Sequence, residues 1–308
     1  MPSLSKAITL VESEHEKHRT QAEKLINQCL PLSGNSIRIG ITGVPGAGKS
    51  TFIESFGGLL AAEGKKVAIL AVDPSSSQSK GSILGDKTRM ERLVQNSNVF
   101  IRPSASGSHL GGVAKKTRES IVLCEAAGYD VILIETIGVG QSETTVHSMV
   151  DFFLLLQIVG AGDELQGMKR GIMELCDAIL INKADGDNIQ RAKLARQEYI
   201  NALHLFSEKP NGWIPKVLTC SALEHIGIDK VWEMIQSYVS YTKDNDTFIA
   251  KREQQEEFWL FDTLNQAVLN KFYTHKNVKK ELNNQLELLK QKKATPYDAA
   301  STILKFFD

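Results

Sequence analysis

The nonapeptide "GVPGAGKST", Gly43 to Thr51, is the most informative stretch of this 308-residue chain. It fits the pattern GxxxxGK[ST] at every fixed position, and it lies between a strand-like run, "IRIGITG", and a segment with helical spacing. Glycines in such a loop turn backbone N–H groups onto phosphate, and the following helix points its positive end at the same place. A glycine-rich turn with a chance lysine is the alternative, but the strand and helix context favours a nucleotide-phosphate site.

Two side chains of this loop have expected roles of their own. Lys49 is expected to reach the β- and γ-phosphates, which makes it a catalytic candidate, and the Ser50 hydroxyl is expected to bind Mg²⁺. The predicted phosphate-binding residues are Gly43, Val44, Pro45, Gly46, Ala47, Gly48, Lys49, Ser50 and Thr51.

Short apolar runs alternate with helix-length amphipathic segments on both sides of the loop. These runs are "IRIGITG", "KVAILAVD", "NVFIRP", "YDVILIET", "DFFLLLQIVG", "DAILINKAD" and "PKVLTCSAL". This rhythm predicts an α/β fold, a mostly parallel sheet with helices on both faces. We expect a helical extension over residues 1–34, the nucleotide-binding domain over 35–243, and a helical arm over 244–308, where strand signals stop.

The C-terminal arm keeps apolar residues along its length, including Phe258, Trp259, Phe261, Leu264 and Val268. A short helical segment cannot easily bury such a face by itself. The arm is therefore expected either to fold back on the main domain or to pair with another chain.

Composition limits the possible partners. Lys and Arg together number 36, as do Asp and Glu, so the basic excess typical of a nucleic-acid-binding protein is missing. The longest apolar run, Phe152 to Val159, is far shorter than the roughly 20 residues needed to cross a bilayer. The first twenty residues contain no apolar signal core, and the four cysteines form no CxxC pair. We expect a cytoplasmic protein that binds neither nucleic acid nor membrane.

The stretch "NKAD", Asn182 to Asp185, follows the predicted strand "DAILI" and indicates which base is bound. A carboxylate here accepts hydrogen bonds from both N1–H and the exocyclic amine of guanine, whereas adenine has no N1–H donor. Adenine would leave the carboxylate of Asp185 unpaired and is therefore rejected. An ordinary surface turn is the alternative. The predicted guanine-site residues are Asn182, Lys183 and Asp185, with Ser221, Ala222 and Leu223 closing over the base through backbone amides.

Acidic residues end two of the predicted strands, Asp73 in "AILAVDP" and Glu135 in "VILIETIGVGQ". The carboxyl ends of parallel strands face the phosphate loop, where Mg²⁺ and its waters need partners. Glu135 stands where many GTPases have the Asp of DxxG, and we expect it to act through a metal-bound water. The N–H of Gly138 is expected to meet the γ-phosphate. Val139 stands where Ras-like enzymes have the Gln that positions the attacking water, so slow intrinsic hydrolysis is expected. Gln141 is nearby and is a catalytic candidate for that role.

A polar loop from Asp73 to Met90 leads into a helix and contains Asp86. Asp86 is either a fourth metal candidate, beside Ser50, Asp73 and Glu135, or an acidic residue in the first turn of a helix.

Several of these stretches are known together from one family. "GVPGAGKST", "GSILGDKTRM", "HLGGVA", "ETIGVGQSE", "GAGDELQGMKRGI" and "NKADGDN" resemble the MeaB/ArgK family of P-loop GTPases, which are associated with methylmalonyl-CoA mutase. The resemblance extends from about Ala22 to Tyr241 and is weaker in the arm. It implies the signal-recognition/MinD-like branch of P-loop folds, with the arm mediating homodimerisation.

The resemblance also implies a function. The chain would be a Mg²⁺-dependent GTPase chaperone that binds a coenzyme-B12-dependent acyl-CoA mutase, gates adenosylcobalamin loading and protects the mutase from inactivation. In the family, the loop matching Gly160 to Gly171 responds to GTP or GDP and faces the partner. The cobalamin-binding motif DxHxxG does not occur in the sequence, so the chain itself is not expected to hold B12.

Two other functions remain open. The family has also been described as a kinase associated with basic amino-acid transport, although Asp185 argues against a kinase that uses ATP. The chain could also be a scaffold whose partner binding depends on nucleotide but whose turnover is incidental.

Overall fold

The computed structural model describes residues 2–13, 15–72, 90–103, 110–136, 142–160 and 170–306. By the contacts among its residues the chain divides into two compact units, Met1–Arg252 and Glu253–Asp308. The predicted N-terminal extension belongs to the first unit. The predicted arm begins at residue 244, at the end of helix α11 (Ile228–Asp244), whereas the division between the units falls inside helix α12 (Thr247–Thr274).

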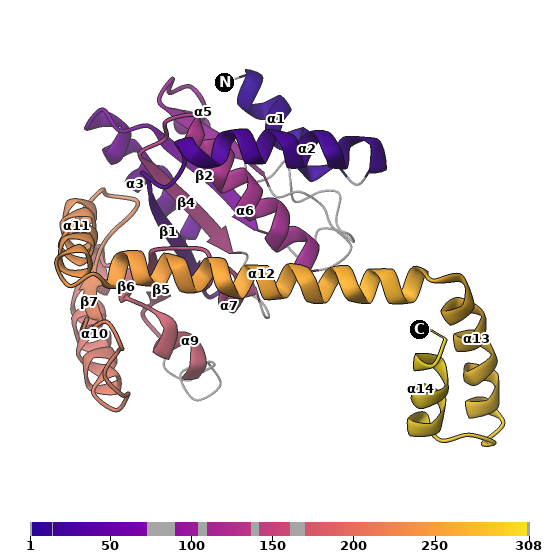
Figure 1. Cartoon of the computed structure of the whole chain (residues 1–308). Coiled ribbons are helices and arrows are strands. Elements are labelled where there is room, and N and C mark those ends of the chain that lie inside the picture. Colours follow the sequence, from indigo (N-terminus) through magenta and orange to yellow (C-terminus); the bar gives the residue numbers. More distant parts are fainter. Residues whose placement is uncertain are drawn as a thin grey trace. The chain divides into compact units, whose positions relative to one another are not determined.

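The first unit is built around a sheet in which the described residues form seven strands (Figure 1). Their order is β3-β2-β4-β1-β5-β6-β7, and every pairing is parallel. The strands are β1 (Ile37–Gly43), β2 (Val67–Val72), β3 (Val99–Arg102), β4 (Val131–Thr136), β5 (Phe152–Ile158), β6 (Ala178–Asn182) and β7 (Lys216–Thr219). Each predicted apolar run contains one strand, and the predicted α/β fold, a parallel sheet with helices and with helical extensions at both ends, is confirmed.

Helices connect the strands and extend both ends of the chain. In the first unit they are α1 (Pro2–Glu12), α2 (Glu16–Cys29), η1 (Leu30–Leu32), α3 (Lys49–Ala62), α5 (Glu91–Val94), α6 (Leu110–Ala126), α7 (Ser142–His147), α9 (Arg170–Leu175), η2 (Gly186–Asn188), α10 (Ile189–Leu203) and α11. Helix α12 follows, and α13 (Lys276–Lys290) and α14 (Pro296–Leu304) end the chain. Helices α13 and α14 contact each other and lie side by side (Figure 1).

The sheet is buried on both faces, which explains why its strands are almost continuously apolar. On one face, inward residues of the strands form the main core with α3 and α11, which contribute Phe52, Phe56 and Trp232. Helices α6, α7 and α9 also contact the strands, and the alternate strand residues Ile132 and Phe153 are fully buried as well. No described helix has the length and apolar character needed to cross a membrane.

Helices α1 and α2 pack against each other and against α6. Ile8 of α1 is fully buried, and Glu12 at the end of α1 forms an ion pair with Arg102 of β3. The predicted N-terminal helices are therefore an integral layer of the first unit.

An ion cluster lies at the amino ends of the central strands. We call it the amino-end cluster, and it consists of Arg38, Glu125, Asp151, Asp177, Lys209, Lys251 and Arg252. Asp151 precedes β5, accepts the backbone N–H of Arg38 at 2.8 Å and pairs with Arg252 through both carboxylate oxygens at 2.7 Å. This pairing ties the beginning of α12 to the base of the sheet.

The other two carboxylates of the amino-end cluster are also paired. Asp177 precedes β6, lies 2.7 Å from Lys209 Nζ and accepts the backbone N–H of Phe153 at 2.9 Å. Burial by itself would raise the pKa of Asp177, but Lys251, Lys209 and the hydrogen bonds hold it below its usual value. The carboxylate of Glu125 forms two 2.9 Å hydrogen bonds with the guanidinium of Arg38.

Candidate functional site

The site lies at the carboxyl end of β1, where the strand order reverses. Strand β1 is flanked by β4 on one side and β5 on the other, so the chain returns to opposite sides of it. In open α/β sheets, ligands bind in the crevice outside the carboxyl ends of the strands at such a point. The phosphate loop begins where β1 ends and passes directly into α3.

The phosphate loop depends on glycine at two closely packed positions. Gly48 is the residue before α3 and has a left-handed φ of 84°, and a Cβ added there would lie 2.7 Å from the amide nitrogen of Asn182. A Cβ at Gly43 would lie 2.3 Å from the carbonyl oxygen of Leu156. These approaches bring the loop close to both β5 and β6, which a side chain would prevent.

Lys49, the first residue of α3, turns back over the loop. Its Nζ donates to the carbonyl of Gly43 at 2.8 Å and to that of Val44 at 3.4 Å. Burial lowers the pKa of Lys49, while the nearby carboxylates of Glu135 and Glu143 raise it in part. A partly desolvated ammonium over a glycine-rich loop suits recognition of a polyphosphate.

Ser50 and Glu135 lie together at the carboxyl end of β4. The Ser50 hydroxyl is 3.5 Å from Oε1 of Glu135, and Glu135 is buried. The next residue of β4, Thr136, donates to the hydroxyl of Thr42 in β1 at 2.8 Å, with both side chains buried. A hydroxyl and a carboxylate at this place are ligands that suit Mg²⁺ beside a phosphate.

Asn182 connects the phosphate loop to the segment after β7. Its amide nitrogen donates to the carbonyl of Ala47 at 2.8 Å, and its amide oxygen accepts the backbone N–H of Ala222 at 3.1 Å. The thiol of Cys220 lies 3.4 Å from the same oxygen. The two motifs predicted to bind phosphate and base are thus joined through one buried side chain.

Asp185 and Ser221 are hydrogen-bonded to each other. The Ser221 hydroxyl also accepts the backbone N–H of Glu224 at 3.1 Å, and the bridge between Ser221 and Ile226 closes the segment into a loop. We call residues 221–226 the base loop. Within it Ala222 is buried, whereas Leu223 is 76% exposed and available to cover a ligand. The predicted residues Asp185 and Ser221 to Leu223 are therefore brought together.

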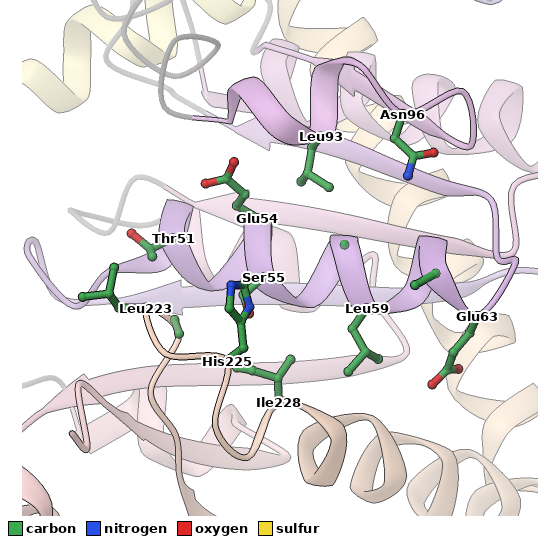
Figure 2. Close-up of a pocket in the computed structure, with 13 residues that line it drawn as sticks. Thr51, Glu54, Ser55, Leu59, Glu63, Leu93, Asn96, Leu223, His225 and Ile228 are labelled. Carbon is green, nitrogen blue, oxygen red and sulfur yellow. The ribbon is translucent and has the colours of Figure 1, made fainter.

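A groove of about 910 Å³ borders the base loop. Figure 2 shows its lining, with Thr51, Ser55 and Leu59 on α3, Leu93 on α5, and His225 on the base loop. The Ser55 hydroxyl lies 2.6 Å from Nδ1 of His225. The groove therefore lies beside the predicted nucleotide site and shares Thr51 with it.

Four predicted site residues, Asp73, Asp86, Gly138 and Gln141, lie outside the described residues, as does most of the predicted nucleotide-responsive loop. Within the described part of the chain, no group of three or more His, Cys, Asp or Glu side chains gathers that could hold a metal. The described metal candidates are Ser50 and Glu135.

Two features of the site were not predicted from the sequence. Glu143 of α7 is buried, and its carboxylate raises in part the pKa of Lys49, which burial lowers. Its place in the stretch "ETIGVGQSE", one of those that resemble the family, was the available signal. The pairing of Ser55 with His225 had no signal, because these residues are 170 positions apart and belong to no shared motif.

Comparison with known proteins shows which family the chain resembles. The chain matches the family described as "Methylmalonyl Co-A mutase-associated GTPase MeaB" over residues 4–277. "GTPase ArgK" of Escherichia coli (strain K12) is 47% identical over 304 residues, covering 99% of this chain and 92% of that protein. "Methylmalonic aciduria type A homolog, mitochondrial" of Mus musculus is 43% identical over 314 residues, covering 99% and 76%. A crystal structure of a protein named "LAO/AO transport system kinase" matches with a TM-score of 0.79 and 41% identity, covering 99% and 92%.

Proposed function

The chain belongs to the MeaB family of methylmalonyl-CoA mutase-associated GTPases, and on this premise we propose that it binds and hydrolyses GTP to control a coenzyme-B12-dependent acyl-CoA mutase. The observation that carries the proposal is the position of Asn182, which links the phosphate loop at Ala47 to the base loop at Ala222. This link supports a proposed nucleotide site in which Asp185 recognises the base and Lys49 neutralises the phosphates.

The described residues fit GTP or GDP with Mg²⁺. Ser50 and Glu135 would hold the ion together with the substrate phosphates, and the bound ion supplies neutralisation of charge on the transferring phosphoryl group. Lys49 adds a second positive charge at the same phosphates, from a partly desolvated position where its effect is stronger than in water. Asp73, Asp86, Gly138 and Gln141 keep the roles predicted for them from the sequence. Hydrolysis is expected to be Mg²⁺-dependent and slow in the isolated protein.

The proposed partner is a mutase of the methylmalonyl-CoA type, and the proposed action is to gate adenosylcobalamin loading and to protect the mutase, in the cytoplasm. A kinase associated with basic amino-acid transport is the second candidate, because a protein 41% identical to this chain is named as a transport system kinase. Asp185 opposes it, since a carboxylate at this position favours guanine over adenine.

We also propose a homodimer formed through the C-terminal helices. In α12, Phe261, Leu264 and Val268 recur at helical spacing and are about half exposed in the single chain, at 56%, 49% and 56%. Leu264→Glu should place a charge in this apolar stripe and yield monomers in sedimentation velocity, whereas Glu257→Gln, at an exposed polar position, should not. A Leu264→Glu protein that remains dimeric would refute this interface.

The proposed function is tested by titrating the full chain with purified methylmalonyl-CoA mutase in the presence of GDP or a non-hydrolysable GTP analogue. We expect the dissociation constant to differ at least tenfold between the two nucleotides, because nucleotide can change partner binding only through a difference in affinity. Equal dissociation constants would contradict nucleotide control. ATP hydrolysis as fast as GTP hydrolysis, or phosphoryl transfer to a transport protein, would favour the kinase.

Lys49→Ala tests whether mutase binding by this chain depends on bound nucleotide. The variant should lose nucleotide binding and with it the nucleotide dependence of mutase binding, while Lys66→Ala, which removes an exposed lysine just before β2, should retain both. A Lys49→Ala protein that binds no nucleotide but still binds the mutase as fully as the unsubstituted chain would contradict nucleotide control.

A further inference from the structure

We propose that the Ser55–His225 pair holds the base loop against α3 and thereby slows the release of guanine nucleotide. The inference rests on the proposed function, because it assigns a positioning role within the same site. Figure 2 shows His225 extending from the base loop toward Ser55 at the edge of the groove.

The base loop is short and closed at its ends. The N–H of Ser221 donates to the carbonyl of Ile226, and the N–H of Ile226 donates back, both at 3.0 Å. Near the front of the loop, the N–H of Ala222 is held by Asn182. The far side of the loop includes exposed Glu224 and His225. Its closing bridge and the hydrogen bond from the Glu224 N–H to the Ser221 hydroxyl both lie within the loop, so a second attachment is needed to tie this side to the rest of the fold.

His225 supplies that second attachment from a backbone conformation that few residues adopt. Its φ is 58°, in the left-handed region, which is uncommon for residues other than glycine and persists where surrounding contacts impose it. Gly227, two residues later, is also left-handed, and a Cβ there would lie 3.0 Å from the carbonyl of Thr219. The chain therefore turns sharply twice as it leaves the base loop for α11, and this directs the His225 side chain to α3.

Ser55 receives His225 on the same helix that presents the phosphate-binding residues. Ser55 is only 5% exposed and lies in α3, whose first two residues are Lys49 and Ser50. The pair thus connects the part of the site that holds the base to the rigid element that holds the phosphates. Asn182 and the Ser55–His225 pair restrain opposite sides of the base loop, so the loop must break the pair to swing away from the base.

The groove allows this opening without disturbing the core. It runs along α3 between α5 and the base loop, so the exposed His225 ring is adjacent to open space rather than to packed side chains. Loss of the pair should therefore affect the rate at which nucleotide leaves more than it affects the stability of the sheet.

The test measures release of a fluorescent GDP analogue from the full chain after addition of excess GDP. Ser55→Ala and His225→Gly should each accelerate release about fivefold, which corresponds to about 1 kcal/mol, and the double variant should be no faster than either single variant. Glycine is chosen at position 225 because it removes the imidazole and still adopts the left-handed conformation without strain.

Two controls separate the hydrogen bond from general effects. His225→Asn tolerates positive φ and places an amide atom where Nδ1 was, so its release rate should stay within twofold of the unsubstituted chain. Lys292→Gly replaces another left-handed residue, with φ of 57°, in the second unit and should change nothing.

The outcomes are distinct. Release within twofold of the unsubstituted rate in both Ser55→Ala and His225→Gly, even with a lower melting temperature, would overturn the positioning role. Additive acceleration in the double variant would also overturn it, because the two side chains would then act independently. If the unsubstituted chain retains no guanine nucleotide, the proposed function itself fails, and with it this inference.

Discussion

Both ends of the central strands carry buried carboxylates, but the two ends use them differently. At the amino ends, Asp151 and Asp177 contact cations at 2.7 Å and also accept backbone N–H groups of neighbouring strands. At the carboxyl ends, Glu135 lies 3.5 Å from Ser50, and the nearby Lys49 ammonium donates to loop carbonyls. The close pairs of the amino end join neighbouring strands to one another and to the first residues of α12, as far as Arg252. The looser arrangement at the carboxyl end surrounds the phosphate loop.

We interpret this contrast as buried charge that stabilises the fold at the amino ends and, under the proposed function, binds a ligand at the carboxyl ends. A carboxylate that already accepts hydrogen bonds from cations and N–H groups has little capacity left for a ligand, but its removal leaves those buried cations without the opposite charge beside them. Substitutions at the two ends should accordingly affect different measurements.

The largest effect is expected at the amino end. Asp151→Ala should lower the free energy of unfolding by about 3–5 kcal/mol, because the substitution leaves the largely buried guanidinium of Arg252 without its carboxylate. Urea denaturation measures this change. Glu23→Ala is the matched control, since its pair with Arg19 has side chains 55% and 72% exposed and should contribute less than about 1 kcal/mol. Equal losses from the two variants would remove the distinction between buried and exposed pairs.

The next effect is expected at the carboxyl end. Asp185→Asn should weaken GDP binding about 100-fold, or about 2.7 kcal/mol, because the amide cannot accept hydrogen bonds from both N1–H and the exocyclic amine of guanine. Xanthine has an oxygen in place of that amine, so the substituted protein should gain affinity for XDP. Competition between GDP and XDP measures both changes, with the free energy of unfolding as a control. Unchanged GDP affinity would contradict the assignment of Asp185.

A smaller effect is expected from pH at the amino end. Burial, with help from Lys251 and Lys209 and against the attraction of Asp177, lowers the pKa of His147 from 6.5 to about 4. The unfolded chain then binds a proton at this residue before the folded chain does, so stability should fall as the pH drops from 6.5 toward 4. Between pH 7 and pH 5 the loss should be about 2 kcal/mol.

His147→Gln isolates this contribution, because glutamine is polar but does not titrate. Urea denaturation of both proteins at pH 7 and pH 5 should give a smaller loss for the variant by about 2 kcal/mol. Asp177 also loses stabilising charge in acid, in both proteins alike. If both proteins lose the same unfolding free energy between pH 7 and pH 5, protonation of His147 does not destabilise the folded state, and the prediction is wrong.

Much of the fold could be predicted from local sequence patterns. Seven apolar runs predicted seven strands, because a parallel sheet covered on both faces needs uninterrupted Ile, Val and Leu. The phosphate loop and "NKAD" were recognisable because each packs its chemistry into a few consecutive residues. Both motifs follow parallel strands, whose carboxyl ends lie at one edge of a sheet, and Asn182 joins their segments.

Contacts between distant residues had no such signal and became visible in the folded chain alone. Asp151 and Arg252 are 101 positions apart, and Ser55 and His225 are 170 apart. Periodicity shows which face of a helix or strand is buried, but it does not show which polar residue that face will meet. That depends on how the strands are ordered and where each loop returns. The amino-end cluster and the attachment of the base loop to α3 are therefore products of the tertiary structure.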